Sequence, residues 1–200
     1  MGNPPPGRRD RDTLTLKLCV AGDASVGKTS LIRRFVTDTF DESYISTLGA
    51  KVSSRTFSIA DPRNAGASLA VGATIWDVMG SHGFREMLKD AYFFNAQGVL
   101  LVADLTRLET LRHLPGWHDV VSSVAGDVPV IALVNKTDLA KQASIPIPEI
   151  ERTLGPLGWT WMRTSAKTGE NVERAFAMLA ERYASSLGGA AKPIPPPPTD

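Results

Sequence analysis

The segment from Gly22 to Thr29 reads G-x-x-x-x-G-K-T, and its residue types and spacing point directly to phosphate chemistry. Glycines in this pattern let the backbone wrap closely around a phosphate, while successive N–H groups and a helix start supply positive potential. Lys28 would neutralise terminal phosphates, and the Thr29 hydroxyl could reach a magnesium ion. The pattern therefore predicts a phosphate-binding loop. Such a loop alone does not separate ATPases, kinases and GTPases, because it is blind to the base.

Two further motifs suggest how a base could be read. Asn135 to Asp138 form N-K-x-D, and Ser165 to Lys167 form S-A-K. Both follow apolar runs that are typical of strands, and ligands bind at the carboxyl ends of strands in an open parallel sheet. The Asp138 carboxylate could accept hydrogens from guanine N1 and from the 2-amino group, neither of which adenine offers. These motifs therefore favour guanine.

With the three motifs in this order from Thr13 to Leu187, the chain resembles the Ras superfamily, and its Rab-like branch most closely. The resemblance implies a P-loop GTPase that binds GTP or GDP with Mg²⁺ and hydrolyses GTP. It also implies that Asn135 ties base and loops together, that the Lys136 stem covers the guanine ring, and that the S-A-K backbone contacts the guanine oxygen. The nucleotide-binding residues expected on this basis are Gly22, Asp23, Ala24, Ser25, Val26, Gly27, Lys28, Thr29, Ser30, Phe40, Tyr44, Thr47, Gly80, Asn135, Lys136, Asp138, Ser165, Ala166 and Lys167.

Two segments resemble the nucleotide-sensing switches of the same family. The first, from Tyr44 to Gly49, contains Thr47, which would join Thr29 and Asp77 around the metal. A hydroxyl on a loop reaches the metal only while the third phosphate holds that loop, which couples nucleotide state to shape. The second switch is the W-D-x-x-G sequence ending at Gly80, whose N–H would contact the third phosphate. For Phe40 and Tyr44, ordinary packing is the alternative to a role in binding.

The sequence departs from the family pattern after Gly80. Ser81 and His82 stand where glutamine and glutamate are usual. Glutamine positions the attacking water, and serine is too short to reach in the same way. The resemblance implies a catalytic set of Lys28, Thr47, Gly80 and the residue after it, which here is Ser81. Because of this serine, we expect GTP hydrolysis to be slow. Two interpretations remain open: an enzyme that cycles by hydrolysis, and a scaffold that holds GTP persistently.

Composition narrows the choice of partners. The formal net charge is +1, from 22 basic and 21 acidic residues, so no overall electrostatic field would draw the protein onto nucleic acid. We expect a cytoplasmic monomer that binds effectors, GTPase-activating proteins and exchange proteins through its switches.

Cys19 is the single cysteine and lies in an apolar alternating run, which predicts a buried side chain. The sequence ends in Pro197, Pro198, Thr199 and Asp200, so a direct lipid anchor is not expected.

The elements that must position these motifs follow from periodicity. Apolar runs alternate with helical patterns, which indicates an α/β fold with strands joined by crossover helices. Leu14, Leu16, Leu18 and Val20 share one face of the first strand. We expect one GTPase domain over 13–187, with a six-stranded, mostly parallel sheet and about five helices on both faces, between disordered tails over 1–12 and the Pro-rich 188–200. The expected strands are 14–21, 52–59, 69–76, 98–103, 128–134 and 159–163, the second and third forming a hairpin, and the expected helices include 28–37 and 171–187.

Overall fold

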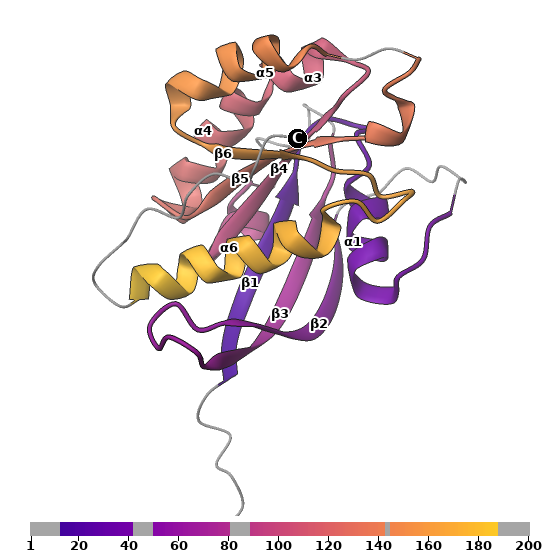
Figure 1. Ribbon diagram of the computed structural model, residues 1–200. Coiled ribbons are helices and arrows are strands. Elements are labelled where there is room, and N and C mark those ends of the chain that lie inside the picture. Colours follow the sequence, from indigo (N-terminus) through magenta and orange to yellow (C-terminus); the bar gives the residue numbers. More distant parts are fainter. Residues whose placement is uncertain (1–12, 42–49, 81–88, 143–144, 188–200) are drawn as a thin grey trace, which may run out of the picture.

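A six-stranded sheet forms the centre of the computed structural model, which describes residues 13–41, 50–80, 89–142 and 145–187. The strand order is β2-β3-β1-β4-β5-β6 (Figure 1). Strand β2 runs antiparallel to β3, and every other pairing is parallel. The predicted sheet is therefore confirmed. The strands are β1 (Thr13–Ala21), β2 (Ala50–Ala60), β3 (Ser68–Val78), β4 (Gly98–Asp104), β5 (Val130–Asn135) and β6 (Thr160–Arg163).

Helices cover both faces of the sheet, as Figure 1 shows. One face packs against α1 and α6, and the other against α3, α4 and α5. These five α-helices of the described residues match the number expected from the sequence. Their bounds are α1 (Lys28–Thr37), α3 (Leu108–Arg112), α4 (Leu114–Ala125), α5 (Ile147–Leu154) and α6 (Val172–Leu187), with short 3₁₀ turns at Thr137–Leu139 and Gly155–Leu157.

Alternation along β1 divides the apolar residues between two cores. Leu16, Leu18 and Val20 face α1 and α6, whereas Cys19 and Ala21 face the other helices. This is the two-residue period expected of a strand buried on both sides. All five side chains are fully buried, and the predicted burial of Cys19 is confirmed.

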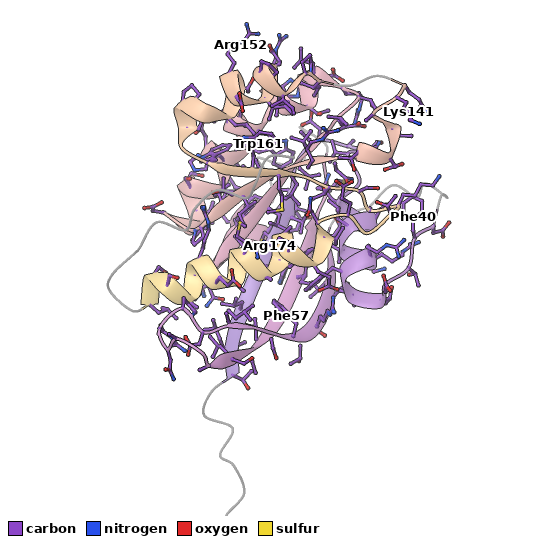
Figure 2. The ribbon with its side chains drawn as sticks, viewed as in Figure 1. Phe40, Phe57, Lys141, Arg152, Trp161 and Arg174 are labelled. Atoms are coloured by element: carbon purple, nitrogen blue, oxygen red, sulfur yellow. The ribbon has the colours of Figure 1, made fainter. Side chains whose placement is uncertain are left out.

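Aromatic rings fill the core beneath α1 and α6. Phe35 of α1 stacks on Phe176 of α6 with ring centroids 3.9 Å apart. Phe57, labelled in Figure 2, meets Phe35 edge-on at 5.2 Å. These contacts bury large apolar areas between α1, α6 and β2, so they fix the helix that begins at the phosphate loop against the sheet.

At its open end, each strand of the β2–β3 hairpin is two residues longer than predicted. Its ladder runs from Ala50 opposite Val78 to Ala60 opposite Ser68. The turn closes with a hydrogen bond from the Asp61 N–H to the Ala67 carbonyl at 2.9 Å. Polar residues at the start of β2 do not weaken the strand, because the antiparallel ladder satisfies their backbone groups.

The remaining differences from the predicted bounds are small. Strand β5 begins at Val130 rather than at Val128, and Pro129 has no N–H to donate to a ladder. Parallel pairing brings the carboxyl ends of β1, β3, β4, β5 and β6 to one edge of the sheet. The phosphate loop, the W-D-x-x-G glycine Gly80 and the N-K-x-D and S-A-K motifs all lie at or just after strand ends at this edge, whereas the first switch lies outside the described residues.

A candidate guanine-nucleotide site

The phosphate loop connects β1 to α1 and takes its shape from residues with positive φ. Gly22 has φ 140°, Gly27 has φ 99° and Ser25 has φ 63°. A Cβ on Gly22 would collide with the Val102 carbonyl, so only glycine fits there. Ala24 and Ser25 form an exposed rim, whereas Gly22 and its neighbours below are buried. The loop before the N-terminus of α1 is therefore exposed to solvent at Ala24 and Ser25, where a phosphate could bind.

Lys28 is folded back into this loop. Its ammonium donates hydrogen bonds to the carbonyl oxygens of Gly22 at 2.8 Å and Asp23 at 2.6 Å. Burial lowers the pKa of Lys28 to about 8, against the opposing effect of the Asp77 and Asp23 carboxylates, and the Arg107 charge lowers it further. A cation held at this low pKa gains much by meeting a phosphate.

Thr29 and Asp77 bring two hard oxygen ligands together. The Thr29 hydroxyl donates to the Asp77 carboxylate at 2.5 Å, and Asp77 is 1% exposed. Pairing of Asp77 with Val20 places β3 directly beside the end of β1. Hydroxyl and carboxylate oxygens are the donors that Mg²⁺ prefers, so the pair fits that ion. The third expected ligand, Thr47, lies outside the described residues.

Gly80 lies against the backbone of the phosphate loop. A Cβ at this position would lie 2.5 Å from the Ala24 nitrogen and 2.5 Å from the Asp23 oxygen. Because real Cβ atoms do not approach so closely, glycine permits this contact between the two segments. Ser81, His82 and Tyr44 lie outside the described residues. Phe40 is described: it is partly buried, packs against the core of α1 and α6, and lies beyond α1 in Figure 2.

Asn135 joins three loops at the end of β5. Its amide nitrogen donates to the Val26 carbonyl of the phosphate loop at 2.9 Å. Its amide oxygen accepts from the Thr164 hydroxyl at 3.2 Å and from the Ala166 N–H at 3.3 Å. The side chain is 1% exposed, so the resemblance-based role of tying the loops together has a direct physical basis.

Asp138 and the S-A-K segment also meet. The Ser165 hydroxyl donates to the Asp138 carboxylate at 2.5 Å, which orients that carboxylate. On the opposite side, Arg34 of α1 donates to the carbonyls of Ala166 at 2.9 Å and Lys167 at 2.7 Å. Sequence reasoning missed Arg34, although it lies on the helix that begins at the phosphate loop.

A second missed group follows β4. Asp104 is buried and accepts from the Lys136 ammonium at 2.7 Å and from Arg107 Nε at 3.1 Å. Although burial raises the pKa of Asp104, hydrogen bonds from Lys136 and Thr106 hold it below its usual value. A polar residue closing an otherwise apolar strand at the ligand-binding edge was the available signal.

A third missed group supports Asp23 in the phosphate loop. The Trp117 indole N–H donates to Asp23 Oδ1 at 2.8 Å, and His113 Nδ1 lies 2.6 Å from Asp23 Oδ2. Trp117 is fully buried in α4, so the loop is anchored to the layer opposite α1. The site is therefore held from both faces of the sheet.

Among the described residues, no helix is both long and apolar enough to cross a bilayer. Comparison with known proteins identifies the family. The family model described as "Ras family" matches residues 17–185. The Ras-related protein RABD2a of Arabidopsis thaliana is 34% identical over 178 residues, which cover 86% of this chain and 84% of that protein. The GTP-binding protein YPTM1 of Zea mays is 31% identical over 175 residues, which cover 87% of this chain and 80% of that protein. With a phosphate loop, N-K-x-D and S-A-K motifs and a six-stranded sheet in one arrangement, the chain belongs to the Ras family, as a Rab-like GTP-binding switch protein of the Ras superfamily.

Proposed function

We propose that this chain binds GTP and GDP with Mg²⁺, and that it hydrolyses GTP slowly when no partner is present. The observation that carries the proposal is the pair of links through Asn135, one to Val26 and one to Ala166. They hold the phosphate loop and the base-reading segment in one rigid unit. Such a unit suits a ligand that is bound at both its base and its phosphates, as a nucleotide is.

Base selectivity would come from Asp138. Its carboxylate, oriented by Ser165, would accept two hydrogens from guanine. The Lys136 ammonium is held by Asp104 at 2.7 Å, and its aliphatic stem would then cover the guanine ring. Adenine offers the Asp138 carboxylate neither of these two hydrogens, so it would displace water from the carboxylate without replacing the lost hydrogen bonds, and this lowers affinity strongly.

At the phosphate end, the backbone of the loop, the start of α1 and Lys28 would neutralise the phosphates. Thr29, Asp77 and Thr47 would hold Mg²⁺, which when bound would neutralise charge on the transferred phosphate. Gly80, which lies against Asp23 and Ala24, would donate its N–H to a third phosphate. The chain would then bind GTP and GDP in different shapes of its two switch segments, which effectors, activating proteins and exchange proteins would recognise.

Slow hydrolysis follows from Ser81. The water that attacks the third phosphate must be held in line, and the serine side chain is too short to replace glutamine there. A partner could supply the missing group, since an inserted arginine is worth on the order of 10³ to 10⁵ in rate. The same residue favours the alternative function, a GTP-bound scaffold with negligible hydrolysis.

Competition between nucleotides tests the binding site. Fluorescent GDP should be displaced by GTP and GDP far better than by ATP. Asp138→Asn should shift preference toward xanthine nucleotides, because the amide can donate to the xanthine carbonyl while its oxygen still accepts from Ser165. Asp119→Asn, at an exposed position on α4, is the matched control and should change nothing. Equal displacement by ATP and GTP would refute the assignment.

Single-turnover phosphate release from GTP-loaded protein separates the two functions. We expect slow but measurable release, and Ser81→Gln should accelerate it. Complete absence of release over many hours, with GTP still bound, would favour the scaffold. Rapid release by the wild type would show that another group positions the water.

A further inference from the structure

Arg107 reaches from the start of α3 to the rim of the phosphate loop. Its Nη2 donates to the Ala24 carbonyl at 2.9 Å, although the two residues are 83 positions apart. Ala24 is the loop residue whose nitrogen lies against Gly80. Arg107 therefore holds the loop close to the end where the third phosphate of GTP would lie.

The same guanidinium also contacts the base-reading side of the site. Nε donates to Asp104 Oδ2 at 3.1 Å, and that oxygen also lies 2.7 Å from the Lys136 ammonium. The Asp104 side chain is only 2% exposed, whereas those of Arg107 and Lys136 are partly exposed. Two cations thus share one buried carboxylate. Arg107 contacts the phosphate loop, and Lys136 belongs to the N-K-x-D segment.

Local hydrogen bonds fix the backbone of Arg107 independently of its side-chain contacts. Its N–H donates to the Asp104 carbonyl at 2.9 Å, and its carbonyl accepts from the Thr110 hydroxyl at 2.7 Å. The other oxygen of Asp104 accepts from the N–H and the hydroxyl of Thr106, at 2.9 and 2.8 Å. Because the backbone of Arg107 is fixed, only side-chain freedom is lost when its guanidinium binds Ala24 and Asp104.

We propose that Arg107 is a positioning residue that couples the phosphate loop to the guanine-reading segment, an inference that rests on the nucleotide binding proposed above. The connection runs from Ala24 through Arg107 and Asp104 to Lys136. A nucleotide that engages Lys136 with its base stabilises Asp104 and Arg107, and so fixes the loop around its phosphates. Burial is the main cause of the lowered pKa of Lys28, and repulsion from Arg107 lowers it further, so Arg107 acts on the phosphate loop through its charge as well as through its hydrogen bond.

The proposal predicts how fast nucleotide leaves. Arg107→Ala removes a charged hydrogen bond to the loop, and should accelerate GDP release about tenfold. Arg107→Lys keeps the charge, but one ammonium cannot replace the two-sided fork, so about threefold acceleration is expected. Arg112→Ala is the matched control, because Arg112 lies on the same helix, is 60% exposed and pairs with Glu149 away from the site. Its GDP release should stay within about twofold of the wild-type rate.

The coupling itself requires a double-mutant cycle on GDP release, with Lys136→Ala as the second change. If Lys136 acts on Arg107 through Asp104, then Arg107→Ala should accelerate release less than about threefold in the Lys136→Ala background, against tenfold in the wild type. Thermal unfolding of the nucleotide-free proteins serves as the control for a structural effect. The Arg107 and Arg112 variants should melt at similar temperatures.

The measured release rates test each part of the proposal. Equal factors in both backgrounds would overturn the coupling, and unchanged release by Arg107→Ala would overturn the positioning role. Wild-type release rates in Arg107→Lys would show that charge alone suffices, which also contradicts the two-sided fork. Failure of the wild type to bind fluorescent GDP would instead refute the proposed function, and this result is distinct from the other three.

Discussion

Replacing Asn135 with alanine should separate the two halves of the nucleotide site. The amide makes three hydrogen bonds, to Val26, Thr164 and Ala166, and it is 1% exposed. A net contribution of about 1 kcal/mol per hydrogen bond gives a loss of about 3 kcal/mol in the free energy of unfolding. Because the Val26 and Ala166 links also hold the loops, the same change should accelerate nucleotide release by about 10².

Asn135→Asp isolates the link to the phosphate loop. An aspartate can still accept from Thr164 and Ala166, but it sets a carboxylate oxygen against the Val26 carbonyl where the amide donated a hydrogen. We therefore expect Asn135→Asp to lose nucleotide affinity nearly as strongly as Asn135→Ala. Both variants would be compared with wild type by urea unfolding in the nucleotide-free form and by release of fluorescent GDP.

The result that would refute this reasoning is specific. If Asn135→Ala unfolds within about 0.5 kcal/mol of wild type and releases GDP at the wild-type rate, the three hydrogen bonds do not hold the loops. If only stability falls while GDP release is unchanged, Asn135 supports the fold and has no part in binding.

Three further predictions concern single positions. Gly80→Ala would drive a Cβ into the backbone of Asp23, so calorimetric titration should show a larger loss of affinity for GTP analogues than for GDP, and equal losses would contradict a third-phosphate contact. The pKa of Lys28 is about 8 in the free protein and must rise when phosphates bind, so GDP binding near pH 9 should take up a proton, and affinity should be flat below pH 8 and fall above it. Titrations in buffers of different ionisation enthalpy measure that uptake, and identical heats at pH 9 would exclude it. Burial raises the pKa of Cys19 to about 12, so alkylating reagents should modify the native protein only at its unfolding rate, whereas rapid modification would show that the thiol is accessible.

Local patterns in the sequence account for much of the fold. The two-residue alternation in β1 predicts which side chains enter which core, and the bounds expected for the first helix agree with those of α1. This helix ends where it does because Asp38 has a left-handed conformation, and its N–H returns to the Arg34 carbonyl. Local chemistry of this kind does not depend on distant residues, and so the sequence alone predicts it.

The supporting residues of the site could not be predicted in the same way. Arg107 and Trp117 contact the phosphate loop across 83 and 94 residues, and Arg34 contacts the S-A-K segment across more than a hundred. Which helical side chains reach a given loop depends on how the helices lie on the sheet, which periodicity does not specify. Asp104 was nevertheless marked by its polarity, because it closes an otherwise apolar strand at the ligand-binding edge.

The central place of β1 in the sheet has a consequence for how the protein is made. Synthesis proceeds from the N-terminus, so β1 and the phosphate loop leave the ribosome first. Yet β1 pairs with β3 and β4, with Leu18 opposite both Ile75 and Gly98, and so it stays without neighbours until those strands have been translated. The N-K-x-D and S-A-K segments, which follow β5 and β6, come later still. If Asp138 reads the base as proposed, a nascent chain acquires its phosphate loop long before it can tell guanine from adenine, and selectivity would arise only when Ser165 docks beside Asp138.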